Sequence, residues 1–193
     1  MRTALIKRKT KETEISIALN IDGRGNSKIN TGIRFLDHML ELVAKHGLFD
    51  IKLSAKGDLD VDQHHTVEDI GIALGMAFEK ALGNKKGIMR AGYFVFPMDE
   101  SLAIVAVDIS GRPYIKFDAD FSVSKIGDLE AAVIEDFFTA FANNLKCSLH
   151  IVLPYGRNPH HEAEAIFKAF AKAMMVACTI GRVKKLPTTK GRI

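Results

Sequence analysis

The sequence has no tryptophan and only two cysteines, Cys147 and Cys178, in 193 residues. Two cysteines far apart in the chain predict neither a disulfide framework nor a cysteine-based zinc site. No apolar run approaches the roughly 20 residues that a membrane-spanning helix needs. Residues 1–7 also lack the apolar stretch of a signal peptide. We therefore expect a cytoplasmic protein with no membrane partner.

An excess of one charge sign is also missing. The chain has 27 Lys and Arg against 23 Asp and Glu, which gives a formal net charge of +4. The basic residues are scattered and no basic–aromatic motif appears, so we expect no nucleic-acid partner. A modest positive balance suits an enzyme that acts on a small phosphorylated substrate.

Apolar periodicity is what the sequence does contain. Residues alternate between apolar and polar as in strands, or form short buried runs, over residues 15–21, 49–55, 102–109, 115–121 and 147–153. Helical spacing of apolar residues predicts helices over about 35–45, 67–81, 129–144 and 166–177. Asp128 is a plausible N-cap for the third of these helices.

The same order of elements occurs twice along the chain. Two His-His pairs lie 96 residues apart, about half the chain, and His38 precedes the first pair much as Asp136 precedes the second. Such spacing indicates an internal duplication. We predict an α+β fold in which each repeat is a β-sheet with two helices on one face. The repeats, about 1–88 and 89–180, would pack as a single domain and be followed by a basic tail, 181–193.

Two His-His-x-x-Glu segments, residues 64–68 and 160–164, carry the strongest chemical signal. Positions i and i+4 project from one face of a helix, so His64 with Glu68, and His160 with Glu164, can each grip a metal ion. Imidazole and carboxylate ligands without sulfur suit manganese, iron or zinc. One such segment is often only a polar helix start. Two copies in repeated contexts favour metal binding.

Other candidate residues are weaker when each is considered alone. His38 lies among apolar residues and by itself indicates a hydrogen-bonded buried histidine, but the repeats make it a candidate third ligand. Packing roles are about as plausible as functional roles for His46 and His150. Glu14 is by default a solvent-facing strand residue.

Three basic residues, Arg90, Arg112 and Lys190, lie at glycine-containing turns. Glycine lets the backbone approach a ligand closely, and arginine binds phosphate oxygens in a bidentate fork. Thr188 and Thr189 could add hydroxyl donors. Each basic residue alone is more often a surface charge, so the prediction of a phosphate site depends on their joint presence.

Six stretches of the chain together resemble the imidazoleglycerol-phosphate dehydratase family of histidine biosynthesis. They are residues 31–40, 46–50, 62–69, 97–102, 110–114 and 160–169. The resemblance covers nearly the whole chain in order. It is specific because the Phe-Leu-Asp-His-Met segment occurs together with both His-His-x-x-Glu segments.

The resemblance implies a duplicated fold whose subunits form trimers that assemble into a 24-subunit homo-oligomer. It implies two Mn²⁺ ions in each active site, where subunits meet, and a reaction that removes water from imidazole glycerol phosphate to give imidazole acetol phosphate. The implied metal ligands are His38, His64, His65, Glu68, His160, His161 and Glu164. The implied substrate-binding residues are Glu14 and His46 at the reacting part, and Arg90, Arg112, Lys168, Thr188, Thr189 and Lys190 at the phosphate.

The implied mechanism is a hydro-lyase reaction through a metal-stabilised imidazolate. A metal on the imidazole favours loss of the ring N–H, as metals lower the pKa of bound water, and the ring can then expel the hydroxyl group as water. The predicted catalytic residues are Glu14, His46, Glu68 and Glu164, of which Glu14 is the candidate for proton transfer from the resemblance alone.

One position departs from the family pattern. Family members often have a metal-binding histidine where this chain has Asp136. A carboxylate there could bind the metal directly, or it could orient a liganding histidine by a hydrogen bond. Both alternatives stay open at the level of sequence, and we include Asp136 among the predicted metal-site residues.

Two other functions fit parts of the pattern. A hydrolase that uses metal-bound hydroxide would share the ligands but would not need a phosphate site. A metal-storage helical bundle uses Glu-x-x-His on long helices; here the order of the two residue types is reversed, and strand patterns fill much of the chain.

Overall fold

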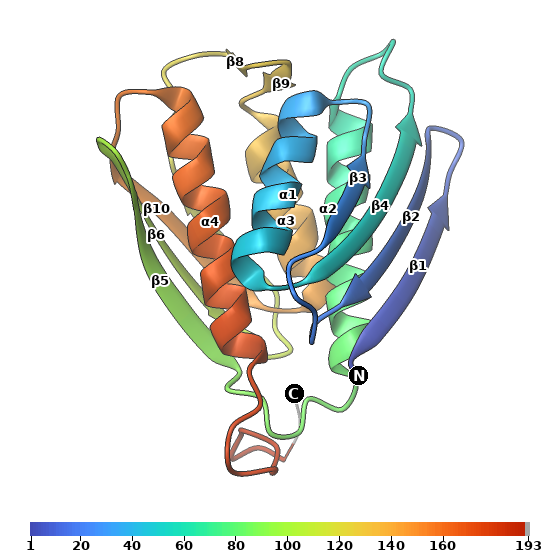
Figure 1. The fold of residues 1–193 in the computed structure, drawn as a ribbon, viewed down its shortest axis with the longest axis vertical. Coiled ribbons are helices and arrows are strands. Elements are labelled where there is room, and N and C mark those ends of the chain that lie inside the picture. The colour runs from blue at the N-terminus through green and yellow to red at the C-terminus, as the bar shows by residue number, and fades with distance from the viewer. Residues whose placement is uncertain (192–193) are drawn as a thin grey trace.

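The computed structural model describes residues 1–191, which form two four-stranded sheets with two layers of helices between them (Figure 1). The helices are α1 (Arg34–Gly47), α2 (His64–Leu82), α3 (Val133–Leu145) and α4 (Pro159–Cys178). The strands of the first sheet are β1 (Thr3–Lys9), β2 (Thr13–Asn20), β3 (Ser27–Asn30) and β4 (Asp50–Gly57). Those of the second are β5 (Ala91–Met98), β6 (Ser101–Asp108), β7 (Tyr114–Asp118) and β10 (Ser148–Tyr155), and the short pair β8 (Lys125–Ile126) and β9 (Leu129–Glu130) lies apart.

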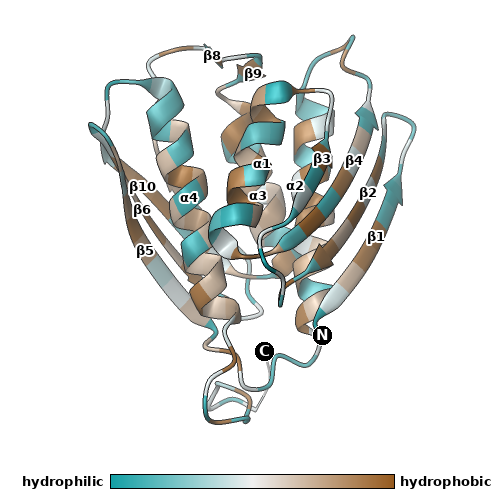
Figure 2. Ribbon diagram, in the orientation of Figure 1, coloured by the Kyte–Doolittle hydropathy of each residue, from teal (hydrophilic) through white to brown (hydrophobic). Residues whose placement is uncertain are grey.

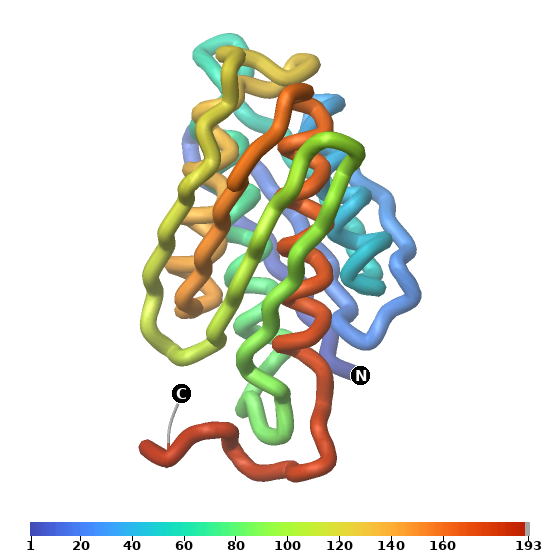
Figure 3. The backbone as a smooth tube through the Cα atoms, turned by 90° about the vertical axis from the view of Figure 1, so that its left-hand side faces the viewer, coloured from blue at the N-terminus to red at the C-terminus, as the bar shows by residue number. Residues whose placement is uncertain are grey.

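The two sheets have the same topology. Their strand orders are β1-β2-β4-β3 and β5-β6-β10-β7. In each sheet the third strand of the order pairs antiparallel with the second and parallel with the fourth. Each sheet has two helices on one face, α1 and α2 on the first and α3 and α4 on the second (Figures 1 and 3). The predicted α+β class and the duplication are therefore confirmed.

The helix ends align the repeats residue by residue. Both α1 and α3 end at a residue in the left-handed region, Leu48 at φ 57° and Lys146 at φ 59°. His38 and Asp136 lie the same number of residues before these C-caps. Asp136 therefore occupies in the second repeat the position that His38 occupies in the first.

The core lies between the sheets, where the inward faces of the strands meet the apolar faces of the helices (Figure 2). On β2, for example, Ile15 and Ile17 are buried, whereas Glu14, the residue before Ile15, is exposed. Fully buried aromatic rings join the helices. Phe78 of α2 contacts Phe141 of α3 across the two layers, and rings of α3 contact Phe167 and Phe170 of α4 within one layer. Burial of one such ring stabilises the fold by about 1.5–3 kcal/mol.

Two glycines allow α2 and α3 to pack closely. A Cβ atom at Gly71 would lie 2.4 Å from the carbonyl oxygen of Phe137, and one at Gly75 would lie 2.6 Å from that of Phe141. Both distances are shorter than a real Cβ contact. The backbone of α3 thus occupies the space that side chains on this face of α2 would need.

The third helix begins later than its apolar pattern predicts. It starts at Val133, and Leu129 belongs to β9. Asp128 is not the N-cap of this helix, because its two carboxylate oxygens accept hydrogen bonds from the backbone N–H groups of Arg34 (2.7 Å) and Phe35 (2.8 Å). These N–H groups are unpaired donors at the start of α1, so Asp128 caps a helix 94 residues away.

Strands β1, β3, β5, β8 and β9 were not predicted. In β5 both faces are apolar, with Tyr93 and Val95 exposed and Phe94 and Phe96 half-buried, so no alternation marks the strand. Strand β3 has four residues, too few for a period to show. Within residues 1–191, no helix is both long and apolar enough to cross a membrane. Residues 192 and 193 of the predicted tail lie outside the described part of the chain.

Candidate active site

All four helices begin at the same end of the molecule (Figures 1 and 3). A helix N-terminus carries a partial positive charge that stabilises nearby carboxylates. Each His-His pair lies in the first turn of a helix. The backbone N–H of His64 donates to Asp62 (2.8 Å), and that of His160 donates to the N-cap residue Asn158 (3.0 Å). In both repeats, a side chain two residues before the first histidine therefore supports the start of the helix that carries the pair.

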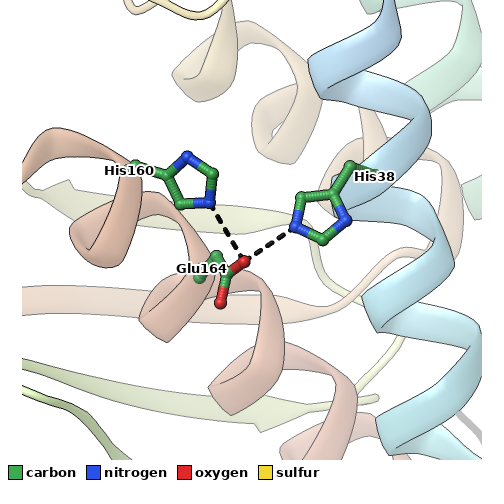
Figure 4. A group of neighbouring side chains, drawn as sticks. All are labelled: His38, His160 and Glu164. Carbon is green, nitrogen blue, oxygen red and sulfur yellow. Dashed lines mark hydrogen bonds and ion pairs between the residues drawn. The ribbon is translucent and has the colours of Figure 1, made fainter.

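One cluster joins His38 of α1 to His160 and Glu164 of α4 (Figure 4). The Nε2 atom of His38 lies 2.7 Å from Glu164 Oε1, and the Nε2 atom of His160 lies 3.1 Å from the same oxygen. Two imidazole nitrogens and a carboxylate oxygen therefore converge from two helices. Such a donor set suits a divalent transition metal.

Glu164 is buried yet stays ionised. Burial raises the pKa of its carboxyl, but hydrogen bonds with Lys168, His38 and His160 outweigh burial and lower the pKa to about 2. The Nζ atom of Lys168 donates to Glu164 Oε2 at 2.5 Å. Lys168 also lies 5.7 Å from the centre of the Phe96 ring. Within one chain, Lys168 thus contacts the metal-type cluster and not the predicted phosphate residues.

A second cluster occupies the equivalent place on α2 and α3. The Nδ1 atom of His64 lies 3.2 Å from Asp136 Oδ2, and its Nε2 atom lies 3.8 Å from Glu68 Oε2. All three side chains are more than a third exposed. Asp136 therefore contacts the histidine through Nδ1, on the side of the ring away from Nε2.

The second histidine of each pair contacts a different carboxylate. His65 Nδ1 lies 3.1 Å from Asp58, and His161 Nδ1 lies 3.1 Å from Glu100. These hydrogen bonds raise the pKa of both histidines, and the hydrogen bond with His161 lowers the pKa of Glu100 to about 2. Neither Asp58 nor Glu100 was predicted, because both lie in turns outside the His-His-x-x-Glu segments.

A basic cavity of about 450 Å³ gathers most of the predicted phosphate residues. It is lined by Arg90, Ser110, Arg112, Pro187, Thr188, Thr189 and Lys190. Arg90 donates to both carboxylate oxygens of Asp108, at 2.7 and 2.9 Å, and to the carbonyl oxygen of Pro187 at 2.9 Å. Arg90 thus fixes the tail against the start of β5. The sequence predicted these residues from separate turns, and the structure brings them together.

Three further candidates lie outside these groups. Glu14 is exposed on β2 and pairs with Lys9 at 2.7 Å, and this hydrogen bond lowers its pKa. His46 packs edge-on against Phe96 at 5.6 Å, and burial lowers its pKa. His150 is exposed beside Tyr114. Glu14 has no histidine neighbour among the contacts of the described residues.

Comparison with known proteins shows the family to which the chain belongs. The family model described as Imidazoleglycerol-phosphate dehydratase matches residues 31–174. The chain belongs to this family. The Imidazoleglycerol-phosphate dehydratase of Koribacter versatilis is 54% identical over 193 residues, which cover 99% of each chain. That of Thermoanaerobacter pseudethanolicus is 55% identical over 192 residues, which cover 99% of each chain.

Solved structures of the family have the same fold. The imidazoleglycerol-phosphate dehydratase of Staphylococcus aureus superposes with a TM-score of 0.84 at 41% identity, covering 92% of this chain and 99% of the other. The Pyrococcus furiosus enzyme, solved in complex with (S)-C348, gives 0.85 at 34% identity, covering 97% and 100%. The resemblance inferred from the sequence is confirmed, and the chain is a dehydratase, a lyase of histidine biosynthesis.

Proposed function

We propose that this chain removes water from imidazole glycerol phosphate to give imidazole acetol phosphate, with two Mn²⁺ ions in each active site. The observation that carries the proposal is the convergence of His38, His160 and Glu164 on one point between two helices (Figure 4). The names of the relatives supply the substrate and the reaction type.

The donor groups fit a divalent metal. His38 and His160 both present Nε2, and Glu164 is kept as a carboxylate at neutral pH. The residues His64 and Glu68 would hold a second ion, with His65 and His161 as further ligands. A bound divalent metal supplies a Lewis acid that favours loss of the imidazole N–H of the substrate.

The basic cavity fits the phosphate group. Arg90 uses its donors on Asp108 and Pro187, so it organises the cavity, and Arg112 and Lys190, which form no ion pair among residues 1–191, supply positive charge. The hydroxyl groups of Thr188 and Thr189 add donors. Charge-assisted bonds to a phosphate are among the stronger hydrogen bonds in proteins.

Within one subunit, the metal-type cluster and the basic cavity lie near opposite ends of α4. His160 is in the first turn of α4, whereas the backbone N–H of Arg90 donates to Ala177 near the last turn of the same helix. At 1.5 Å per residue the separation along the helix is about 25 Å. A small substrate cannot touch both ends. We therefore propose that subunits complete each other's active sites in a homo-oligomer, with 24 subunits implied by the resemblance.

The test is an assay of product formation from imidazole glycerol phosphate by purified enzyme. Removal of metal with a chelator should abolish turnover, and Mn²⁺ should restore it. His160→Ala should stay inactive with Mn²⁺, whereas His150→Ala, which alters an exposed histidine on another face, should behave as the parent. Full turnover after chelation would refute the metal role, and no product from the parent with Mn²⁺ would refute the dehydration.

A further inference from the structure

Each repeat holds the second histidine of its His-His pair against a carboxylate oxygen. His65 meets Asp58 and His161 meets Glu100. Both contacts use the Nδ1 atom of the ring, and both distances are 3.1 Å. The same ring geometry therefore occurs at two independent places in the chain.

The two carboxylates do not occupy equivalent positions in the repeats. The registers of β2 with β4 and of β6 with β10 make Glu12 the equivalent of Glu100, and the register shift before Tyr155 makes Gly156 the equivalent of Gly57 and Arg157 the equivalent of Asp58. Glu12 lies 4.0 Å from His65, beyond hydrogen-bond distance, while Asp58 makes the contact instead. The repeats differ in which residue they use, and they agree in the contact that is made.

We infer that Asp58 and Glu100 are positioning residues that keep the proton of His65 and His161 on Nδ1 and leave Nε2 free as a metal ligand. This inference rests on the proposed metal-dependent function. An ionised carboxylate can only accept a hydrogen bond, so the nitrogen that faces it must donate. The other nitrogen then has a lone pair for an ion, and the carboxylate also fixes the plane of the ring.

The surroundings of Glu100 allow a selective substitution. Its Oε1 accepts the backbone N–H of Asn158 at 2.9 Å, and its Oε2 faces His161. In Glu100→Gln the amide oxygen can keep the bond to Asn158, which leaves the amide N–H₂ towards His161. That group donates, so Nδ1 must accept and the proton moves to Nε2. The variant thus blocks the ligand atom while it keeps the support for the start of α4.

The experiment titrates metal-free enzyme with Mn²⁺ and follows the free ion by electron paramagnetic resonance. Glu100→Gln should weaken Mn²⁺ binding by about 10–100-fold, the usual effect of losing a carboxylate that orients a liganding histidine. Glu12→Gln is the matched control, because it makes the same change at the equivalent position of the other repeat, in a side chain that lies 4.0 Å from His65 and is 53% exposed. Its effect should be small. Asp58→Asn repeats the test in the other repeat.

High salt distinguishes ring orientation from simple charge. Salt screens the attraction of an exposed carboxylate for the ion, whereas the position of the ring proton does not depend on ionic strength. The loss in Glu100→Gln should persist at high salt. Parent-like affinity in both Glu100→Gln and Asp58→Asn, or a loss that high salt removes, would overturn the inference. A parent enzyme that binds no Mn²⁺ would instead refute the proposed metal function.

Discussion

Asp136 lies in the second repeat where the first repeat has His38, and its carboxylate is 3.2 Å from Nδ1 of His64. A carboxylate in this place can orient the histidine towards an ion. Asp136→Ala should therefore weaken Mn²⁺ affinity by about 10–100-fold. The measurement is a metal titration, with the neighbouring exposed Glu135→Ala as the control. Equal affinities for Asp136→Ala and the parent would show that Asp136 neither binds the metal nor supports a ligand.

Asp50 gives the fold a dependence on acid. Its Oδ1 accepts the backbone N–H groups of Arg24 and Asn26, each at 2.9 Å, and these bonds lower the pKa of the carboxyl. A lowered pKa in the folded state means that the stabilisation is present at neutral pH and is lost as pH falls through that lowered value.

Asp50→Asn should consequently lower the melting temperature at neutral pH, and the difference from the parent should shrink below about pH 4, where the unfolded carboxyl also binds its proton. Melting curves between neutral and acid pH check this. Asp60→Asn, at an exposed residue, serves as the control. A constant difference across the whole range would contradict the assignment.

The close packing of α2 on α3 depends on two glycines of α2, Gly71 and Gly75, which place no side chain between the helices. Gly71→Ala gains up to about 1 kcal/mol of helix propensity, but its methyl group would meet the backbone of α3. Overpacking of this kind costs about 1–3 kcal/mol, so the substitution should destabilise the protein overall. Denaturant unfolding at a fixed protein concentration measures it. Met76→Ala, on the exposed side of α2, is the control, and a Gly71→Ala protein as stable as the parent would show that the helices can move apart.

Elements of regular period were predicted well, and their ends were not. The α4 helix was found from its apolar face, but its first turn is set by Asn158 and Pro159. The apolar pattern placed the start of α3 too early because Leu129 continues the helical spacing. Leu129 instead belongs to β9, which pairs with β8. Which helix a side chain caps depends on which unpaired backbone N–H groups lie next to it in the folded protein. Asp128 therefore caps α1 through a contact that no local pattern encodes.

At the scale of the whole molecule, the separation of the clusters predicts active sites shared between chains. His160→Ala and Arg112→Ala chains should each be inactive or nearly so. When they are co-expressed with different tags and purified through both tags, their assemblies should regain activity in roughly a quarter of the sites, as random mixing of a two-chain site allows.

The matched control mixes Arg90→Ala with Arg112→Ala chains. Both changes fall in the same basic cavity of one chain, so every site would carry one damaged cavity and activity should stay low. Mixed assemblies of the first kind that remain as inactive as their parents would contradict a shared site and would require both clusters of one site to come from one chain.

The sequence by itself determined the duplication, the α+β class and the family. The duplication and the class depend on features that recur along the chain, namely apolar periodicity and two His-His-x-x-Glu segments, and the family depends on six stretches in a fixed order. Period, spacing and order are all properties of the sequence itself. It also named His38, His160 and Glu164 among the metal ligands, without assigning any ligand to a particular ion. The structure places these three together.

Only the tertiary structure decided which carboxylate faces which histidine. Asp58 and Glu100 come from turns that the two sheets carry to the helix N-termini, and their contacts follow from strand register. The structure also put the basic cavity at the far end of α4, away from His160 and Glu164. Distances between residues remote in sequence are set by packing in three dimensions, and a pattern read along one chain contains no measure of them.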